Sequence, residues 1–443
     1  MEQKQLADFV GNVATVRREH FPDLGFLLPD GRLTVRVDRR DVSAVRVQLP
    51  GKQVLHLHSI HLEGTGFDDL VAATTLSASS SWRDFDEVLR RGTLLDPGEH
   101  GTGLHTDRER RPWVEIRFVR PADVSRITLR NVATSTASRA SGMTVSVQMA
   151  DSRQWETVYD GAARLAELDA MVTEMTAQAP ADAAPLVTAL APIARDAVIG
   201  DYRAAWRALD ASDDLSPEQR ALLRGVVSDV LLTPHSLEWT IHGMKRSFRF
   251  WSEAERSDYV GEALAVVEGL RGLTDKVCFG FGTVLGLVRD GALIPHDDDI
   301  DIIVGLEPHE ASTLAEGLAL IRTFLGDRGY EVHGNHLSHH GVRTSGRRAV
   351  DVFVGLFEGD TIAWYPGKRG SLTRDIMYPT SVGSLLGHDC PLPRDPLAYL
   401  ERVYGPGWRV PDPGFSHSWR PKPFTDIAGP RARAEGTSPG AEK

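Results

Sequence analysis

The residues best suited to chemistry are carboxylates in the C-terminal half of the sequence. The stretch Phe279 to Val304 reads FGFGTVLGLVRDGALIPHDDDIDIIV and ends in an acidic run among apolar residues. If that run forms a strand, Asp297, Asp299 and Asp301 share one face while the isoleucines point into a core. Such close carboxylates repel one another unless a cation lies among them, and oxygen ligands select hard ions. The run therefore predicts a Mg²⁺ or Mn²⁺ site.

Further residues accompany the carboxylates in a fixed order. Gly282 and Thr283 lie upstream, where a turn without bulky side chains lets backbone N–H groups approach a phosphate. Arg289 follows, and Asp351 comes later, on a predicted strand from Arg347 to Phe357. Asp351 is predicted either to complete a second metal site or to accept the proton of an attacking hydroxyl. Metal ions held in this way neutralise phosphate charge and align the attacking and leaving oxygens. The set predicts metal-dependent phosphoryl-group transfer.

This order of residues is similar to the core of polymerase-β-like nucleotidyltransferases. More specifically, GTVLGLVRDGALIPHDDDID resembles the signature of the LicD family, which includes the phosphocholine transferases of bacterial glycans. The fukutin-related proteins, which move ribitol phosphate, belong to the same wider group. Later segments resemble the family in the same order: the VDVF strand at Asp351, Met377-Tyr378-Pro379, and Val403-Tyr404-Gly405 ending at Trp408. The resemblance covers about residues 250–413.

The resemblance implies a reaction and a set of roles. A CDP-activated alcohol (choline, ribitol or glycerol) would give its phospho-alcohol to a hydroxyl of a glycan or glycolipid, and CMP would leave. Asp299 and Asp301 would be the primary metal ligands, and Asp297 a ligand or a residue behind them. The other implied site residues are the phosphate contacts and the third acidic position: Gly282, Thr283, Arg289 and Asp351.

The sequence departs from the family pattern in two places. His296 stands where many relatives carry an aromatic residue before the aspartates. The cysteine zinc site of the fukutin-related proteins is missing, because Cys278 and Cys390 are the only cysteines. His296 in place of an aromatic residue bears on whether the donor pocket has the shape found in the family.

Other interpretations stay open. A nucleotidyltransferase that uses a nucleoside triphosphate would share every carboxylate and differ only in releasing pyrophosphate. A metal-dependent glycosyltransferase also carries Asp-x-Asp, but the upstream glycine turn fits that class poorly. A different class is a glycan-binding or scaffolding protein with an inactive catalytic domain. The simplest alternative is an acidic loop that binds structural Ca²⁺ or faces solvent.

These residues need a scaffold to position them, and the sequence pattern predicts a multidomain α+β protein. We expect an N-terminal helix over residues 1–23 and an antiparallel β-sandwich over 24–161, where short runs alternate between apolar and polar residues. A helical connector over 162–250 leads to a nucleotidyltransferase-like α/β catalytic domain over 251–427. The last residues, 428–443, have the composition of a disordered tail.

The predicted sandwich resembles a discoidin-like domain. The motifs are ASSSW ending at Trp82, PWVE from Pro112, SRITLRN from Ser125, and Gln148 followed by Trp155. Such domains bind glycans or lipid head groups, but a packing module without a ligand fits this region equally well. Trp82 and Trp113 are expected in the core rather than on a sugar-binding surface.

The segment LEWTIHGMKRSFRFW, residues 237–251, is dense in aromatic and cationic side chains. His242 is predicted to be a structural histidine at a domain junction. Lys245, Arg246 and Arg249 are expected either to line an anionic site or to form a solvated face.

Composition limits the possible partners and compartments. The net charge of -11 argues against a general nucleic-acid binder, which needs a basic face. Two cysteines provide no disulfide framework, and the charged N-terminus lacks an apolar signal core. No run of about 18 apolar residues is present. We therefore expect a cytoplasmic protein, with peripheral contact to a membrane-borne substrate left open.

Overall fold

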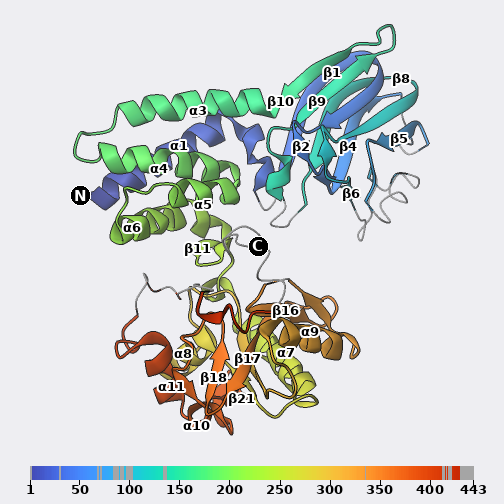
Figure 1. Ribbon diagram of the computed structural model, residues 1–443. Helices are drawn as coiled ribbons and strands as arrows, with labels where there is room; N and C mark the ends of the chain where they lie inside the picture. The colour runs from blue at the N-terminus through green and yellow to red at the C-terminus, as the bar shows by residue number, and fades with distance from the viewer. Residues whose placement is uncertain are drawn as a thin grey trace. The chain divides into compact units, whose positions relative to one another are not determined.

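The computed structural model describes residues 2–28, 31–66, 69, 72–82, 89, 94–95, 103–132, 137–334, 336–411, 415, 417 and 422–429. The chain divides into an N-terminal unit, Met1–His235, and a C-terminal unit, Ser236–Lys443 (Figure 1). Residues 236–250, which the sequence suggested as the end of the connector, belong to the C-terminal unit. Of the predicted disordered tail, residues 430–443 lie outside the described residues.

An antiparallel sheet built on two long strands dominates the N-terminal unit. β1 (Arg32–Gln48) and β8 (Trp113–Arg130) pair along most of their lengths. The strand order is β10-β9-β1-β8-β4, and β5 also pairs with β8. These partners are β4 (Ser59–Thr65), β5 (Thr74–Ala78), β9 (Thr144–Met149) and β10 (Trp155–Asp160). Two short pairs complete the sheets: β2 (Lys52–Gln53) with β7 (Glu109–Arg110), and β3 (His56–Leu57) with β6 (Leu104–His105). The predicted sheet-rich N-terminal region is confirmed.

Alternating side chains explain this sheet. Along β1, Leu33 and Val35 are buried while Arg32 and Thr34 are exposed, as expected for a sheet with one solvated face. The register of β1 against β8 shifts between Arg36 and Ala44. Such bulges bend a strand and increase its twist.

Two tryptophans of this sheet lie against a partly buried charge pair. Arg46 on β1 donates to Glu115 on β8 at 2.7 Å. The same guanidinium lies 4.2 Å from the ring centre of Trp155 and 5.1 Å from that of Trp113. Trp82, in contrast, is 39% exposed, so the expectation that it is a core residue is wrong.

The N-terminal helix and the predicted connector pack on each other. α1 (Glu2–His20) contacts α4 (Ala184–Ile199) and α6 (Pro217–Val227), and α4 also contacts α3 (Gly161–Ala177) and α5 (Tyr202–Asp210). α6 begins at a capping box in which Ser216 and Gln219 satisfy each other's backbone N–H groups. No described helix has the length and apolar character needed to cross a bilayer.

Asp196, a buried carboxylate in α4, should make the stability of the N-terminal unit depend on pH. Burial raises the pKa of Asp196 from 3.8 to about 6, although Arg195 opposes the shift. Because the pKa of Asp196 is higher in the folded state, its carboxyl group contributes fully to the free energy of unfolding below pH 3.8. That contribution is lost as the pH rises through about 6. We therefore expect Asp196→Asn to raise the free energy of unfolding at pH 8 by about 1–3 kcal/mol, with little gain at pH 4. Denaturant titrations at both pH values measure this, with the exposed Asp182→Asn as control; equal gains at both would contradict it.

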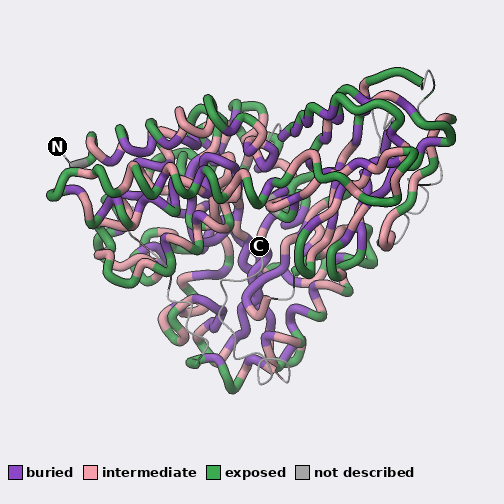
Figure 2. The backbone as a smooth tube through the Cα atoms, turned by 90° about the horizontal axis from the view of Figure 1, so that it is seen from above, coloured by how far each residue is buried: buried purple, intermediate pink, exposed green. Residues whose placement is uncertain are grey.

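The C-terminal unit is a mixed sheet covered by helices. The strand order is β13-β14-β17-β16-β15, where β14 and β17 run parallel and the other pairs antiparallel. The strands are β13 (Val277–Phe279), β14 (Asp301–Leu306), β15 (Glu331–His333), β16 (His339–Arg343) and β17 (Val350–Glu358). β18 (Thr361–Trp364) pairs with the end of β17 and with β19 (Leu372–Thr373), and β20 (Ser381–Leu385) with β21 (His388–Leu392). Buried side chains of these strands belong to one hydrophobic cluster, and Figure 2 colours the backbone by burial.

Helices cover the sheet, and one of them, α11, anchors the start of α8. The helices are α7 (Glu253–Arg271), α8 (Phe281–Asp290), α9 (Leu314–Gly326), α10 (Arg374–Met377) and α11 (Pro396–Tyr404). α7 and α9 contact sheet strands, and α8 contacts α11. The backbone N–H of Phe281 donates to the Tyr399 hydroxyl on α11 at 2.9 Å, so the first turn of α8 is anchored in the core.

Candidate active site

Three carboxylates meet where two parallel strands begin. Asp301 opens β14 and lies in register with Asp351 on β17. Residues paired across parallel strands present their side chains on the same face. Asp299 reaches the same place from the preceding loop, and ligand atoms of the three carboxylates lie within 4.8 Å of one another. We call Asp299, Asp301 and Asp351 the carboxylate triad.

The prediction of a strand running from Asp297 through Asp301 is wrong. β14 begins only at Asp301, and residues 295–300 form a loop, the acidic loop. Its backbone is held from outside, because Phe248 N–H donates to the Asp297 carbonyl and Arg249 N–H to the Pro295 carbonyl, both at 2.8 Å. Consecutive aspartates in a loop do not alternate between two faces, so each has its own surroundings.

Asp297 lies against the start of α8 rather than among the triad. Its Oδ2 is 2.5 Å from the position that a Cβ on Gly282 would occupy. Burial, and then the charge of Asp299, raises the pKa of Asp297 well above its usual value. Gly282, proposed from sequence as part of a phosphate turn, therefore makes room for this carboxylate in the first turn of α8.

This close approach predicts that Gly282→Ala destabilises the C-terminal unit. An alanine inside a helix normally stabilises by about 1 kcal/mol relative to glycine. Here the added Cβ displaces the Asp297 carboxylate, whose Oδ1 accepts from the Asp298 N–H at 3.0 Å, so the carboxylate cannot move without straining this hydrogen bond, at a cost of about 1–3 kcal/mol. Gly261→Ala in α7 is the matched control, because its nearest atom would lie 3.7 Å away. Thermal unfolding should separate the two variants; equal melting temperatures would contradict the steric argument.

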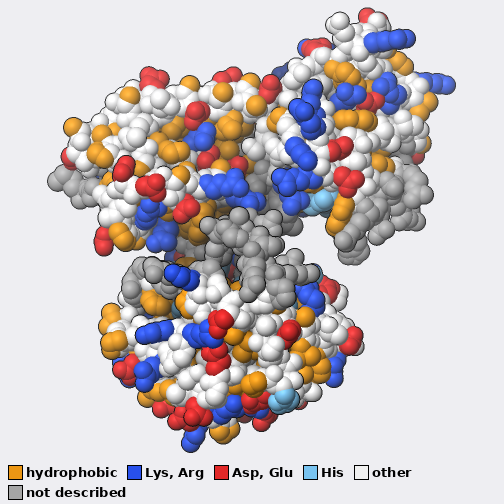
Figure 3. Space-filling model, in the orientation of Figure 1, with side chains coloured by type: hydrophobic (Ala, Val, Ile, Leu, Met, Phe, Trp, Pro, Cys, Tyr) orange, Lys and Arg blue, Asp and Glu red, His pale blue; other side chains and the backbone are white. Residues whose placement is uncertain are grey.

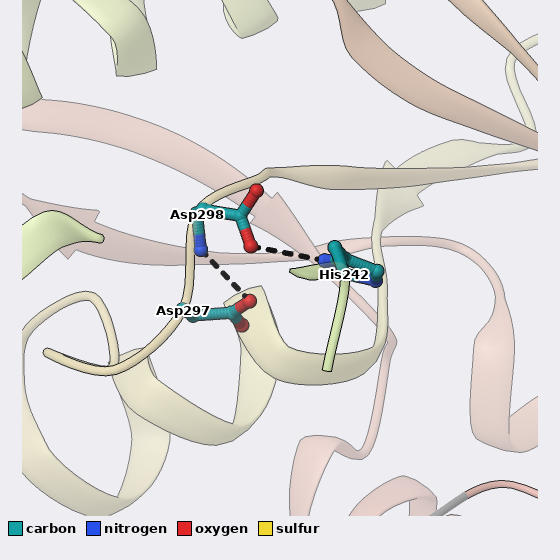
Figure 4. Close-up of side chains that lie close together, drawn as sticks. All are labelled: His242, Asp297 and Asp298. Atoms are coloured by element: carbon teal, nitrogen blue, oxygen red, sulfur yellow. Dashed lines mark hydrogen bonds and ion pairs between the residues drawn. The ribbon is translucent and has the colours of Figure 1, made fainter. Parts of the chain in front are cut away.

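Asp298 binds an upstream hairpin, formed by β11 (Glu238–Thr240) and β12 (Gly243–Lys245). Its carboxylate accepts from the Thr240 hydroxyl and from His242 Nδ1, both at 3.0 Å, and lies 3.1 Å from Lys245 Nζ. Burial opposes ionisation of Asp298, but the His242 hydrogen bond and the Lys245 charge outweigh it and lower its pKa to about 2. Figure 4 shows His242 pointing at Asp298, with Asp297 beside it.

His242 connects the hairpin to the triad. Its Nδ1 lies 3.2 Å from Asp299 Oδ2 as well as 3.0 Å from Asp298 Oδ1. Burial disfavours the charged ring, but hydrogen bonding to Asp298 and the charge of Asp299 raise its pKa to about 9. With Asp297 and Asp298 it forms a second group whose ligand atoms lie within 4.8 Å. The sequence suggested a structural histidine; no spacing signal links it to aspartates so far along the chain.

Another histidine that the sequence did not suggest lies beside the third carboxylate. His339 Nε2 is 3.4 Å from Asp351 Oδ2, and its Nδ1 is 2.7 Å from the Ser338 hydroxyl. The His339 side chain is buried and stacks on the ring of His336. Ser338 and His336 therefore hold this imidazole against Asp351.

Thr283 and Arg289, the other predicted phosphate contacts, make structural contacts. The Thr283 hydroxyl is buried and accepts from Asp301 N–H at 3.1 Å, which fixes the start of β14. Arg289, in the last turn of α8, donates to the Asp290 carboxylate at 2.8–3.0 Å. Their predicted roles toward phosphate stay predictions.

The triad fits a hard divalent cation. It offers only oxygen ligands, each partly exposed, within reach of one ion. Unneutralised carboxylates at this separation repel one another in a partly buried site. Positive or donor groups reach the triad at its edges, from His242 and from His339. The residues present could therefore bind Mg²⁺ or Mn²⁺ at this position.

Of three comparisons with known proteins, one bears on this location. No curated protein matches the chain. A solved structure of ANT(2")-Ia in complex with adenylyl-2"-tobramycin is 12% identical, covering 33% of this chain and 72% of that one, with a TM-score of 0.24. A similarity this loose carries no argument. Residues 276–395 match the family model for LicD/FKTN/FKRP, nucleotidyltransferase domain, and this segment contains the whole triad. The match supports LicD family membership through this domain.

Proposed function

We propose that this protein transfers a phospho-alcohol from a CDP-activated donor to a hydroxyl of a glycan or glycolipid, and releases CMP. The alcohol is choline, ribitol or glycerol. The observation that carries the proposal is the meeting of Asp299, Asp301 and Asp351 within 4.8 Å inside the segment that matches the LicD family model. A LicD family domain suggests a transferase that acts on glycans; the donor and the alcohol are the proposed part.

Each triad residue has a role in the proposed mechanism. Asp299 and Asp301 would hold Mg²⁺ or Mn²⁺, which neutralises charge on the donor diphosphate when bound. Asp351 accepts the proton of the attacking hydroxyl as its oxygen forms a bond to the β-phosphorus of the donor and the bond to CMP breaks. His339, at 3.4 Å, stabilises the Asp351 carboxylate in the orientation that faces Asp301. Gly282, Thr283 and Arg289 remain proposed contacts for the donor phosphates.

A donor panel tests this proposal. Purified protein with Mg²⁺ or Mn²⁺ is incubated with CDP-choline, CDP-ribitol, CDP-glycerol, nucleoside triphosphates and UDP-sugars, and the products are identified by mass spectrometry. We expect metal-dependent release of CMP from one CDP-alcohol. Pyrophosphate release from a triphosphate would instead establish a nucleotidyltransferase. No turnover of any donor would favour a binding protein.

A further inference from the structure

Three strand segments of the N-terminal sheet present an unusual set of charges. In register, Arg32 on β1 lies opposite Arg130 on β8, and Arg36 lies opposite Arg126. All four are exposed. Along each strand, exposed positions alternate with buried apolar side chains. We call Arg32, Arg36, Arg126 and Arg130 the arginine strip. Figure 3 shows Lys and Arg side chains gathered over the strands of this unit.

The arginine strip costs the fold stability. Like charges directly opposite across an antiparallel pair destabilise it by some tenths of a kcal/mol to about 1 kcal/mol. Acids offset the charge only in part: Glu63 on β4 pairs with Arg126 at 3.0 Å, and Asp38 pairs with Arg36. Within residues 31–66 and 103–132, no acid forms an ion pair with Arg32 or Arg130. On a chain of net charge -11, this local cationic strip is complementary to an anionic partner.

Spacing and chemistry on the strip indicate what kind of anion fits. The two arginine pairs lie four residues apart, about 13 Å along the strands, and about 5 Å separates the members of a pair. Between the pairs, the hydroxyls of Thr34 and Thr128 lie 3.3 Å apart, and His61 is opposite Thr128 on β4. Guanidinium groups bind phosphate oxygens, and hydroxyl and imidazole groups bind polyol hydroxyls. The strip therefore alternates phosphate-binding and polyol-binding positions.

The residues around the strip distinguish a chain of phosphates and polyols from other polyanions as its ligand. In the described residues, the exposed large hydrophobic side chains are Trp82, Val119, Ile241, Val382, Leu397 and Val410, and none stands on residues 32–36, 59–63 or 126–130. The strip thus offers nothing to insert into a bilayer and no Trp, Tyr or Phe ring on which nucleic-acid bases could stack. An extended chain of alternating phosphate and polyol suits it better.

We propose that the arginine strip binds a phosphodiester-linked glycan or polyol-phosphate polymer. This inference rests on the proposed function, because each transfer of a phospho-alcohol adds one phosphodiester charge to the acceptor. The product would thereby become a better ligand for the N-terminal unit as it gains charge. The strip retains the polymer through arginine–phosphate contacts, and the threonine hydroxyls and His61 contact its polyol units.

The test compares two variants of the full chain that lose equal charge. One carries Arg32→Gln, Arg36→Gln, Arg126→Gln and Arg130→Gln; the control carries Arg108→Gln, Arg110→Gln, Arg153→Gln and Arg207→Gln on other exposed surfaces. Binding of fluorescent synthetic poly(glycerol phosphate) is measured by anisotropy at several salt concentrations. We expect the strip variant to bind at least about tenfold more weakly and the control within about twofold of wild type. Because like charges are removed, the strip variant should melt no lower than wild type.

Several results would overturn the proposal: no binding of the polymer by wild type, equal loss in both variants, or tighter binding to phosphatidylglycerol vesicles or single-stranded DNA. The assay contains neither donor nor metal, and it is repeated with the Asp301→Asn chain. Failure of the strip is therefore separable from failure of the transferase. Polymer binding without turnover of any CDP-alcohol would contradict only the proposed reaction.

Discussion

Asp301→Asn is expected to lower the rate of CMP release by about a thousandfold or more, because it removes one charge from the carboxylate triad without changing side-chain size. Asp301 is the triad residue on the sheet itself, in register with Asp351, and its backbone N–H is held by Thr283. The substitution therefore changes the ligand and leaves its position intact. Turnover is measured at saturating Mg²⁺ with the donor that the panel identifies.

A matched variant separates this effect from a general loss of charge. Asp327→Asn removes an exposed carboxylate just after α9 in the same unit, and it should retain wild-type turnover. In the absence of metal, Asp301→Asn should melt no lower than wild type, because three neighbouring carboxylates repel one another. If Asp301→Asn turned over the donor as fast as Asp327→Asn, the triad would not be the catalytic centre.

His242→Ala is expected to lower turnover by about 10–100-fold and to weaken metal binding by a similar factor. His242 contacts Asp298 and Asp299 at once, so its loss removes one of the contacts that hold the acidic loop and leaves Asp298, a buried carboxylate, with Lys245 and Thr240 as its remaining partners. The triad residue Asp299 would then lose its contact with His242. Isothermal titration with Mn²⁺ measures the loss directly.

Two comparisons define the role of His242. His242→Asn, which keeps a polar group near Asp298, should recover part of the metal affinity, whereas His242→Leu, which fills similar space without a polar group, should not; equal recovery by both would indicate a steric role. His309→Ala, at an exposed site in the same unit, should behave as wild type. Unchanged Mn²⁺ affinity in His242→Ala would show that the hairpin does not position the triad.

Much of the fold follows from patterns that the sequence displays. Alternation in segments such as RLTVRVD predicts the antiparallel strands of the N-terminal unit, because one face of that sheet is solvated. The pairing of Asp301 with Asp351 depends on a parallel register, which alternation alone does not specify. The ordered motif suggested that the two act together, and the register explains how they meet.

The local geometry of the acidic run could not be predicted. Alternation of aspartate and isoleucine imitates a strand, but hydrogen bonds from Phe248 and Arg249 hold residues 295–300 as a loop. These donors come from a segment distant in sequence, as does His242, whose neighbours in the chain show no metal-ligand spacing. Likewise, Gly282 was interpreted from its backbone freedom alone, whereas the structure shows the Asp297 carboxylate 2.5 Å from the position of its Cβ.

The central claim is that the carboxylate triad holds the divalent cation of a phospho-alcohol transferase through Asp299 and Asp301. The most direct measurement is a Mn²⁺ titration followed by electron paramagnetic resonance, with wild type, Asp301→Asn and the control Asp327→Asn, each with and without the CDP-alcohol. We predict that wild type and the control bind Mn²⁺ more tightly when the donor is present, and that Asp301→Asn loses this binding. Equal Mn²⁺ binding by Asp301→Asn and wild type, or none by wild type, would contradict the claim.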